Sequence, residues 1–225
     1  MPEIKERPIL FSAPMVRAIL EDRKTVTRRE IKPRMRSADC QFELHQQPDG
    51  SWRPMHTFDE SCMDDQGTEH PIACPYGKPG DRLWVREAFG LQVRHYGGGT
   101  GEHIVYRATN PNAIYCKSAE GREYPVKWKP SIHMPRHSSR ILLEITAVRV
   151  ERLQDISEGQ ARAEGVRLMR DGSGTWVSRE GPGKLVTPWP TAKEAFGDLW
   201  NSINGPDAWG ANPWVWVVEF KRVTP

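Results

Sequence analysis

The sequence predicts an α+β protein that is mainly β: a barrel of about five to seven strands with peripheral helices and long loop insertions. Several short segments carry the β-branched or alternating apolar residues that are typical of strands. The chain contains 19 glycines and 19 prolines, so turns and loops should make up much of it. Most strand candidates are joined by non-helical connections, and closing them into one barrel would remove their exposed edges.

The N-terminal part predicts a helix followed by a strand. Ser12 stands where an N-cap is expected and Pro14 falls in the first turn, which indicates a helix over residues 13–21. The β-branched run Thr25-Val26-Thr27 disfavours helix and indicates a strand over residues 24–31. The apolar residues assigned to the helical pattern are Ile9, Leu10, Met15, Val16, Ile19 and Leu20.

Residues 32–78 are polar and rich in turn formers, which predicts a first insertion outside the barrel. We expect the stretch from Cys40 to Cys74 to be poorly regular, with at most a short hairpin near residues 42–52. Three cysteines and three histidines fall in this insertion: Cys40, Cys62, Cys74, His45, His56 and His70. A zinc site is conceivable there, but the spacing is irregular and no pair is CxxC, so isolated thiols are favoured. We predict no metal and no cofactor.

The middle of the chain predicts a strand and a second insertion. Residues 82–87 alternate like a half-buried strand, with Leu83 and Val85 on one face. The second insertion covers residues 90–127 and contains a glycine-rich tip at residues 97–101. This tip lacks the Lys-Ser/Thr pair of a phosphate-binding P-loop, so we interpret it as a hairpin tip that precedes a strand near residues 103–108.

The C-terminal part predicts two strands, over residues 140–150 and 214–220, and two capped helices. Ser157 and Gln160 have the spacing of a capping box, and Gly165 suits the end of that helix.

Thr191 caps the second helix, which follows a third Gly/Pro-rich insertion at residues 168–190. No internal repeat is visible, and residues 1–225 are expected to form a single domain.

Composition restricts the class of protein. The formal net charge is only +3, which permits a nucleic-acid partner without requiring one. No apolar run approaches the roughly 18 residues that a membrane span needs. The N-terminus also lacks the apolar core of a signal peptide, so we expect a cytoplasmic protein with reduced thiols and no membrane partner.

The strongest candidate for chemistry is the short stretch from Lys24 to Arg29. In a strand, Thr27 and Arg29 point to one face, and Val26 and Arg28 point to the other. Lys24 falls in the preceding turn, where it could reach Thr27. A lysine beside a hydroxyl can act as base and nucleophile. The alternative is a basic strand edge without function, because lysine and arginine commonly protect sheet edges.

Five segments carry a resemblance to the ASCH domain, a family of PUA-like β-barrels, and they span nearly the whole chain in the family's order. They are LEDRKTVTRR at residues 20–29, PGDRLWV at 79–85, LEITAV at 143–148, ISEGQARAEG at 156–165 and VWVVEFK at 215–221. The chain departs from the family signature at Asp22, where a glycine is usual. It is similar to the larger ASCH proteins of phages and prophages.

The resemblance extends by motif to small bacterial N4-acetylcytidine amidohydrolases. It implies a catalytic trio of Lys24, Thr27 and Glu164, with Arg29 matching the family arginine and Arg28 beside it as a substrate contact. An amide on a nucleobase needs a nucleophile, a base and an oxyanion stabiliser, and these residue types supply all three. Two alternatives remain: a module that binds RNA or a modified base without chemistry, and a ribonuclease.

Residues 127–140 form a second candidate site, in which cations alternate with flat or apolar side chains. Basic side chains hold phosphates and aromatic rings stack on unpaired bases, so this segment predicts contact with a nucleoside or single-stranded RNA. The alternative is a loop that covers one end of the barrel with Trp128 and Met134 packed inward. The residues expected to bind substrate here are Trp128, Lys129, His133, Arg136 and Arg140.

Overall fold

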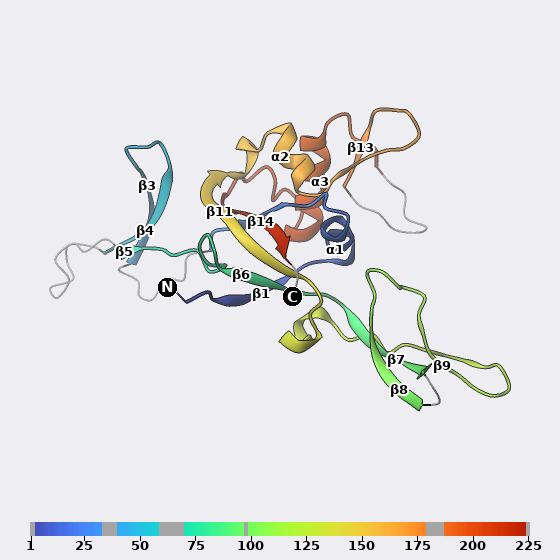
Figure 1. The fold of residues 1–225 in the computed structure, drawn as a ribbon. Coiled ribbons are helices and arrows are strands. Elements are labelled where there is room, and N and C mark those ends of the chain that lie inside the picture. The colour runs from blue at the N-terminus through green and yellow to red at the C-terminus, as the bar shows by residue number, and fades with distance from the viewer. Residues whose placement is uncertain (1–2, 33–39, 59–69, 97–98, 179–186, 224–225) are drawn as a thin grey trace.

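A computed structural model describes residues 3–32, 40–58, 70–96, 99–178 and 187–223. Its centre is a five-stranded sheet with the order β1-β6-β11-β14-β2 (Figure 1). The strands are β1 (Glu6–Leu10), β6 (Arg82–Arg86), β11 (Leu142–Arg152), β14 (Trp214–Val223) and β2 (Val26–Glu30). Only the β1–β6 pair is parallel. The α+β, mainly β class is therefore confirmed.

The sheet is open between its edge strands β1 and β2, so the structure does not show a closed barrel. The two edges are linked by a side chain, because Arg29 Nη2 in β2 donates to the carbonyl of Leu10 in β1 at 2.7 Å. Sequence analysis missed β1 and assigned its residues Ile9 and Leu10 to the helical pattern. Pro8 lies in this strand, and an edge strand tolerates proline because one side of its backbone needs no ladder partner.

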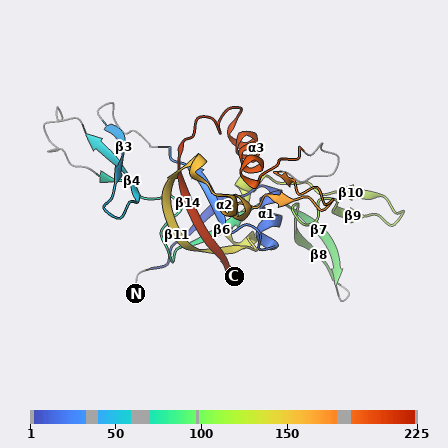
Figure 2. The same ribbon diagram turned by 90° about the horizontal axis from the view of Figure 1, so that it is seen from above.

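Both faces of the sheet are buried, which explains the nearly continuous apolar run of β14. Trp216, Val218 and Phe220 contribute to a core shared with α1 (Ala13–Leu20). Val215 and Val217 contribute to a second core under α2 (Glu158–Ala163) and α3 (Ala192–Asn204). Figure 2 shows the helices grouped over the strands of this sheet.

The helix boundaries follow the local signals in the sequence. The predicted capping box of Ser157 with Gln160 is present at α2. Thr191 caps α3 as expected, and Glu194 completes a second capping box there that was not predicted. Ser12 precedes α1 as expected, but its side chain makes no capping hydrogen bond.

The first insertion is more regular than the sequence indicated. In the described residues it forms a three-stranded sheet of β3 (Cys40–Gln46), β4 (Trp52–Phe58) and β5 (His70–Pro71). The hairpin expected near residues 42–52 is present as β3 and β4. The rest of the described segment is more regular than expected, because this sheet has apolar contacts of its own with the main core. Trp52 packs on Trp214 of β14 with ring centroids 5.0 Å apart.

The second and third insertions also contain paired strands. The second holds β7 (Phe89–Tyr96) with β8 (Gly99–Tyr106), and β9 (Ile114–Lys117) with β10 (Glu123–Pro125). The third holds β12 (Arg167–Leu168) and β13 (Trp176–Val177). The β3–β5 sheet and the β7–β10 hairpins extend from opposite sides of the central sheet (Figures 1 and 2). Three 3₁₀ turns, at Ser131–His133, Arg136–Ser138 and Leu153–Asp155, complete the elements.

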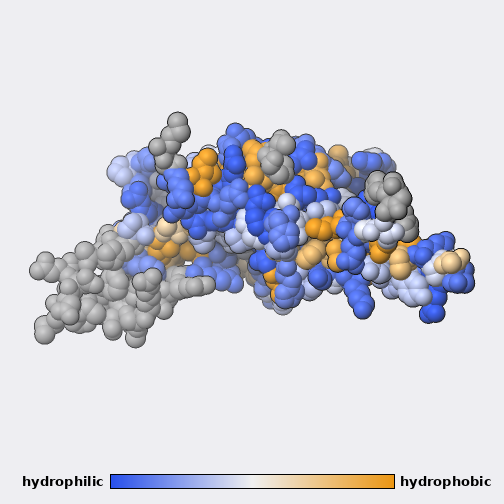
Figure 3. Space-filling view, turned by 60° about the horizontal axis from the view of Figure 1, so that its bottom comes forward, coloured by the Kyte–Doolittle hydropathy of each residue, from blue (hydrophilic) through white to orange (hydrophobic). Residues whose placement is uncertain are grey.

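On the face drawn in Figure 3, hydrophobic areas are separated by hydrophilic residues. None of the helices in the described ranges combines the length and hydrophobicity needed to cross a membrane. Cys62 lies outside the described residues, and within them no three His, Cys, Asp or Glu side chains are grouped to hold a metal ion.

Asp81 connects the start of β1 to the turn before β6, and its removal gives a first prediction. Its Oδ1 accepts from the backbone N–H of Lys5 and its Oδ2 from that of Lys78, each at 3.2 Å. Asp81→Ala should destabilise the fold by about 1–3 kcal/mol, because two N–H groups lose their acceptor. Urea denaturation measures this difference.

The effect should also depend on pH. The hydrogen bond from Lys5 is the main cause that lowers the pKa of Asp81 below its ordinary value. The contribution to stability is therefore complete above the unfolded pKa of about 3.9 and is lost as the pH falls through the lower folded pKa. A difference between wild type and variant that stays constant from neutral pH to about pH 2 would contradict this role.

Candidate functional site

The turn between α1 and β2 fixes the position of Lys24. Asp22 has φ 54, in the left-handed region that glycine adopts freely and other residues adopt rarely. The backbone N–H groups of Arg23 and Lys24 both bond to the carbonyl of Ala18, at 2.9 and 3.1 Å. This tight turn directs the lysine inward, toward the C-terminal end of α2.

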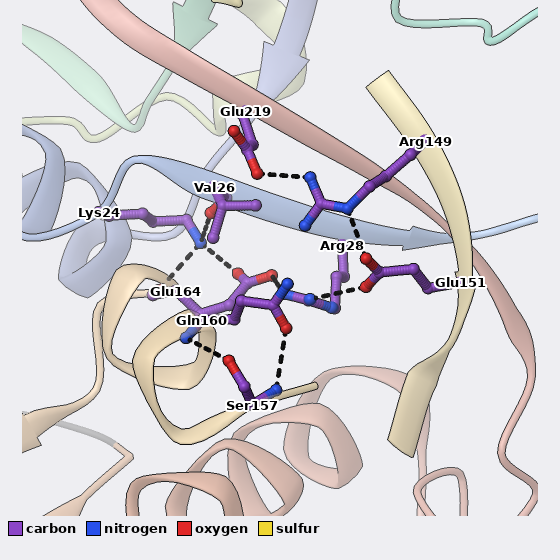
Figure 4. Close-up of polar contacts among 9 residues, drawn as sticks. All are labelled: Lys24, Val26, Arg28, Arg149, Glu151, Ser157, Gln160, Glu164 and Glu219. Atoms are coloured by element: carbon purple, nitrogen blue, oxygen red, sulfur yellow. Dashed lines mark hydrogen bonds and ion pairs between the residues drawn. The ribbon is translucent and has the colours of Figure 1, made fainter. Parts of the chain in front are cut away.

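Lys24 and Glu164 form a buried ion pair. Lys24 Nζ donates to Glu164 Oε2 at 2.6 Å, to the Glu164 carbonyl at 2.9 Å and to the Val26 carbonyl at 2.8 Å (Figure 4). The side chains are 0% and 3% exposed, respectively. Lys24 and Glu164, two members of the expected trio that are 140 positions apart in the sequence, are thus in direct contact in the structure.

Burial lowers the pKa of Lys24, while the nearby Glu164 carboxylate opposes that shift. All three ammonium protons have acceptors, so a neutral amine would lose one of these hydrogen bonds. To act as a base toward Thr27, Lys24 would first have to pass a proton to Glu164. The sequence suggested that Lys24 reaches toward Thr27. In the structure its ammonium group bonds to Glu164 and to the Val26 carbonyl instead.

Arg28, rather than Arg29, contacts Glu164. Arg28 Nη1 lies 3.4 Å from Glu164 Oε1, and its Nη2 donates to Glu151 Oε2 at 3.0 Å. Arg149 joins this network by pairing with both Glu151 and Glu219 (Figure 4).

Sequence analysis missed Glu151, Arg149 and Glu219. The sequence did contain one signal: Arg149 and Glu151 are two positions apart at the end of a predicted strand, so their side chains lie on the same face of β11. What the sequence did not reveal is the register that places this face beside β14 and β2.

Thr27 and Arg29 lie on the opposite face of β2 from Arg28. Thr27 is 2% exposed, and its hydroxyl forms no hydrogen bond with any described residue. The Arg29 guanidinium lies 5.5 Å from the centre of the Phe11 ring. The predicted strand alternation is therefore observed, but it separates Arg29 from Glu164.

Thr27 and Glu164 nevertheless line the same cavity, which has a volume of about 50 Å³ and runs along the free edge of β2 against α3. Arg28, Arg29 and Trp200 also line it. A second cavity of about 260 Å³ adjoins it, between α1, α3 and the β12–β13 hairpin. Four residues line both cavities: Met15, Glu164, Leu199 and Ile203. We call the two cavities together the β2 cleft.

The second predicted site lies apart from the β2 cleft, since none of its residues lines either cavity. Arg136 pairs with Glu6 at 2.7 Å, and Arg140 makes a two-pronged ion pair with the buried Glu87. These contacts hold the segment against the sheet, so both arginines are already engaged.

The remaining residues of that segment are divided between surface and core. Lys129 and His133 are exposed and Trp128 is half-buried, whereas Met134 is buried as the covering-loop alternative expected. Lys129 also borders a cavity of about 530 Å³ on the β7–β10 arm.

The predicted residues therefore fall into two groups. Thr27, Arg28, Arg29 and Glu164 line the β2 cleft, with Lys24 paired to Glu164, and the 127–140 segment lies elsewhere. The cleft combines a hydroxyl, a carboxylate and two guanidiniums around a small cavity. These groups can supply the nucleophile, the base and the oxyanion stabiliser of an acyl transfer. No model of a known protein family, no curated protein and no solved structure matches this chain.

Proposed function

We propose that the β2 cleft binds an N-acylated nucleobase of the N4-acetylcytidine type and hydrolyses its acyl amide. The observation that carries this proposal is the position of Thr27, a buried residue whose hydroxyl has no hydrogen-bond partner among the described residues and which shares a cavity with Glu164. The motif resemblance to N4-acetylcytidine amidohydrolases supports the same chemistry. We further infer that the central sheet corresponds to the PUA-like barrel of the ASCH family. In this chain the sheet is open between β1 and β2, and the hydrogen bond from Arg29 to Leu10 links these two edges.

Cavity size favours a short acyl group. A volume of about 50 Å³ exceeds one water's share of the liquid, about 30 Å³, but is far below the roughly 300 Å³ at which ligand pockets begin. The inner cavity thus suits an acetyl group, and the adjoining cavity of about 260 Å³ suits the base. Longer acyl chains should be poor substrates.

In this proposal Thr27 Oγ attacks the acyl carbonyl carbon and its proton passes to Glu164 Oε1. That oxygen has only the 3.4 Å contact with Arg28, whereas Oε2 is held by Lys24. The carbon–nitrogen bond then breaks, and Glu164 returns the proton to the exocyclic nitrogen of the base. Water hydrolyses the Thr27 ester to release the carboxylic acid. Arg28 and Arg29 line the cavity and can stabilise the oxyanion, while Lys24 positions Glu164.

The second candidate function is a module that binds the modified base without chemistry. One observation favours it: all three ammonium protons of Lys24 are held by acceptors of the protein itself, as in a purely structural ion pair. The two candidates differ in whether Thr27 is needed for turnover or only for contact.

Thr27→Val separates the two functions. The change removes a hydroxyl that no described residue bonds, so stability should change by less than about 1 kcal/mol. If Thr27 is the nucleophile, release of cytidine from N4-acetylcytidine should fall about a thousandfold or more, as measured by chromatography. The matched control is Thr25→Val, which removes an exposed hydroxyl two residues away and should leave turnover within about twofold.

Equal turnover by the two threonine variants would reject Thr27 as the nucleophile. A wild-type protein that binds N4-acetylcytidine but releases no cytidine would instead establish the binding module.

A further inference from the structure

A separate cavity lies between the N-terminal segment with β1, the β3–β5 sheet and the turn before β6. Its volume is about 730 Å³, and it shares no lining residue with the β2 cleft. We call it the N-terminal groove. Its walls therefore come from the first insertion as well as from the central sheet.

Cations greatly outnumber carboxylates around this groove. Among the described residues, Lys5, Arg7, Arg53, Lys78 and Arg149 line it, against one carboxylate, that of Glu3. The whole chain is almost balanced, with 32 Lys and Arg against 29 Asp and Glu. The positive charge of the groove is thus a local concentration and not a result of overall composition.

Four of these five cations have no partner within the described residues. Arg149 is engaged by Glu151 and Glu219, but the side chains of the other four make no hydrogen bond or ion pair there. The Nε atom of Arg7 is buried without a partner. Asp81 lies near Arg7 and Lys78, and Asp49 lies near Arg53, but neither carboxylate forms a direct ion pair with them. Cations remain in excess, so they repel one another, and an anion in the groove would relieve this cost.

The floor of the groove is apolar and partly aromatic. Val148, Val150 and Trp216 supply it from the central sheet, and Trp52 and Ile72 from the β3–β5 sheet. Trp52 is half-buried and is braced from behind by Trp214. A flat ring held in place beside unpaired cations suits a ligand that combines an aromatic face with a phosphate.

We propose that the N-terminal groove binds single-stranded RNA, with a base stacked on Trp52 and the phosphates held by Lys5, Arg7, Arg53 and Lys78. Single strands are recognised by this combination of a basic groove and an aromatic platform. An acidic peptide would satisfy the cations but would leave the aromatic platform without a stacking partner. The proposal does not depend on the reaction in the β2 cleft.

The test is fluorescence anisotropy of a labelled oligouridine titrated with the full chain. The triple variant Lys5→Gln, Arg53→Gln, Lys78→Gln removes three exposed cations, so it should fold normally. We expect it to bind at least about tenfold more weakly than wild type. The slope of log Kd against log salt should also become shallower, by about 0.7 for each lost phosphate contact.

The matched control carries the same change of charge at exposed cations outside the groove: Lys32→Gln, Arg170→Gln and Lys221→Gln. It should bind RNA within about twofold of wild type, because a long-range effect of net charge is screened by salt. Equal loss in the two triple variants would overturn the groove as the site. Thr27→Val should bind RNA as wild type does, which keeps this proposal separate from the reaction.

Competitors decide the ligand class. Duplex RNA, a polyglutamate peptide of equal charge and uridine monophosphate should each displace the oligouridine poorly. Equal competition by duplex would overturn single-strand recognition, and equal competition by polyglutamate would assign the groove to an acidic protein partner. Equal competition by the mononucleotide would show that the site recognises a single nucleotide and not a strand. Failure of wild type to bind oligouridine would reject the proposal.

Discussion

Glu164→Ala is expected to destabilise the protein by about 3–5 kcal/mol, the largest effect of any single substitution considered for the site. The variant leaves the Lys24 ammonium buried without its carboxylate and removes one of the two carboxylates that face Arg28. An uncompensated buried charge costs several kcal/mol, whereas an ion pair as a whole contributes much less. Chemical denaturation measures the difference.

The comparison needs a control and a rescue. Glu144→Ala removes a carboxylate that pairs with the exposed Lys221, so it should cost less than about 1 kcal/mol. The double variant Lys24→Met, Glu164→Ala removes both buried charges and should be more stable than Glu164→Ala alone. A double variant that is less stable than the single one would show that Lys24 does not depend on Glu164 for its burial.

Gly165→Ala is expected to cost about 2–4 kcal/mol and to disturb the site directly. Gly165 has φ 98, a conformation that L side chains rarely adopt. An added Cβ would lie 3.0 Å from the Ala18 Cβ and 3.3 Å from the Lys24 Cβ. Both neighbours are close to the backbone and cannot simply swing away, so α1 or Lys24 would have to shift.

Gly174→Ala separates the backbone conformation from the crowding. Gly174 has φ 72, and an added Cβ there would meet nothing within 4 Å. This control should therefore show only the cost of the positive φ, about 1–2 kcal/mol. If thermal or chemical denaturation gives the two variants equal stability, then crowding of the added Cβ against Ala18 and Lys24 does not contribute to the loss of stability.

Elements with a local signal could be predicted from the sequence. The capping box at Ser157 and the N-cap at Thr191 were found because each is a pattern of residues close together in the sequence. The alternation of Leu83 and Val85 identified β6 for the same reason. In contrast, β1 is five residues long and contains Pro8, so it becomes a strand only through its pairing with β6. The β3–β5 sheet was underestimated because its apolar contacts, such as Trp52 with Trp214, join distant parts of the chain.

The site was predictable in part. Strand alternation placed Arg28 on the opposite face from Thr27 and Arg29, and the structure agrees. It could not indicate that Arg28 would be the arginine beside Glu164, because that depends on which face α2 covers. The pairing of Lys24 with Glu164 came from the family resemblance and not from a local pattern. The cations of the N-terminal groove were missed because they come from separate segments of the chain.

The most direct test of the central claim is a crystal structure of Thr27→Val with N4-acetylcytidine bound, since this variant should keep the substrate intact. We expect the acetyl group in the cavity of about 50 Å³, against residue 27 and Glu164, with the base in the adjoining cavity. Arg28 or Arg29 should lie within hydrogen-bond distance of the acetyl oxygen. Substrate bound outside the β2 cleft, or bound there with its acetyl group directed away from residue 27, would contradict the account.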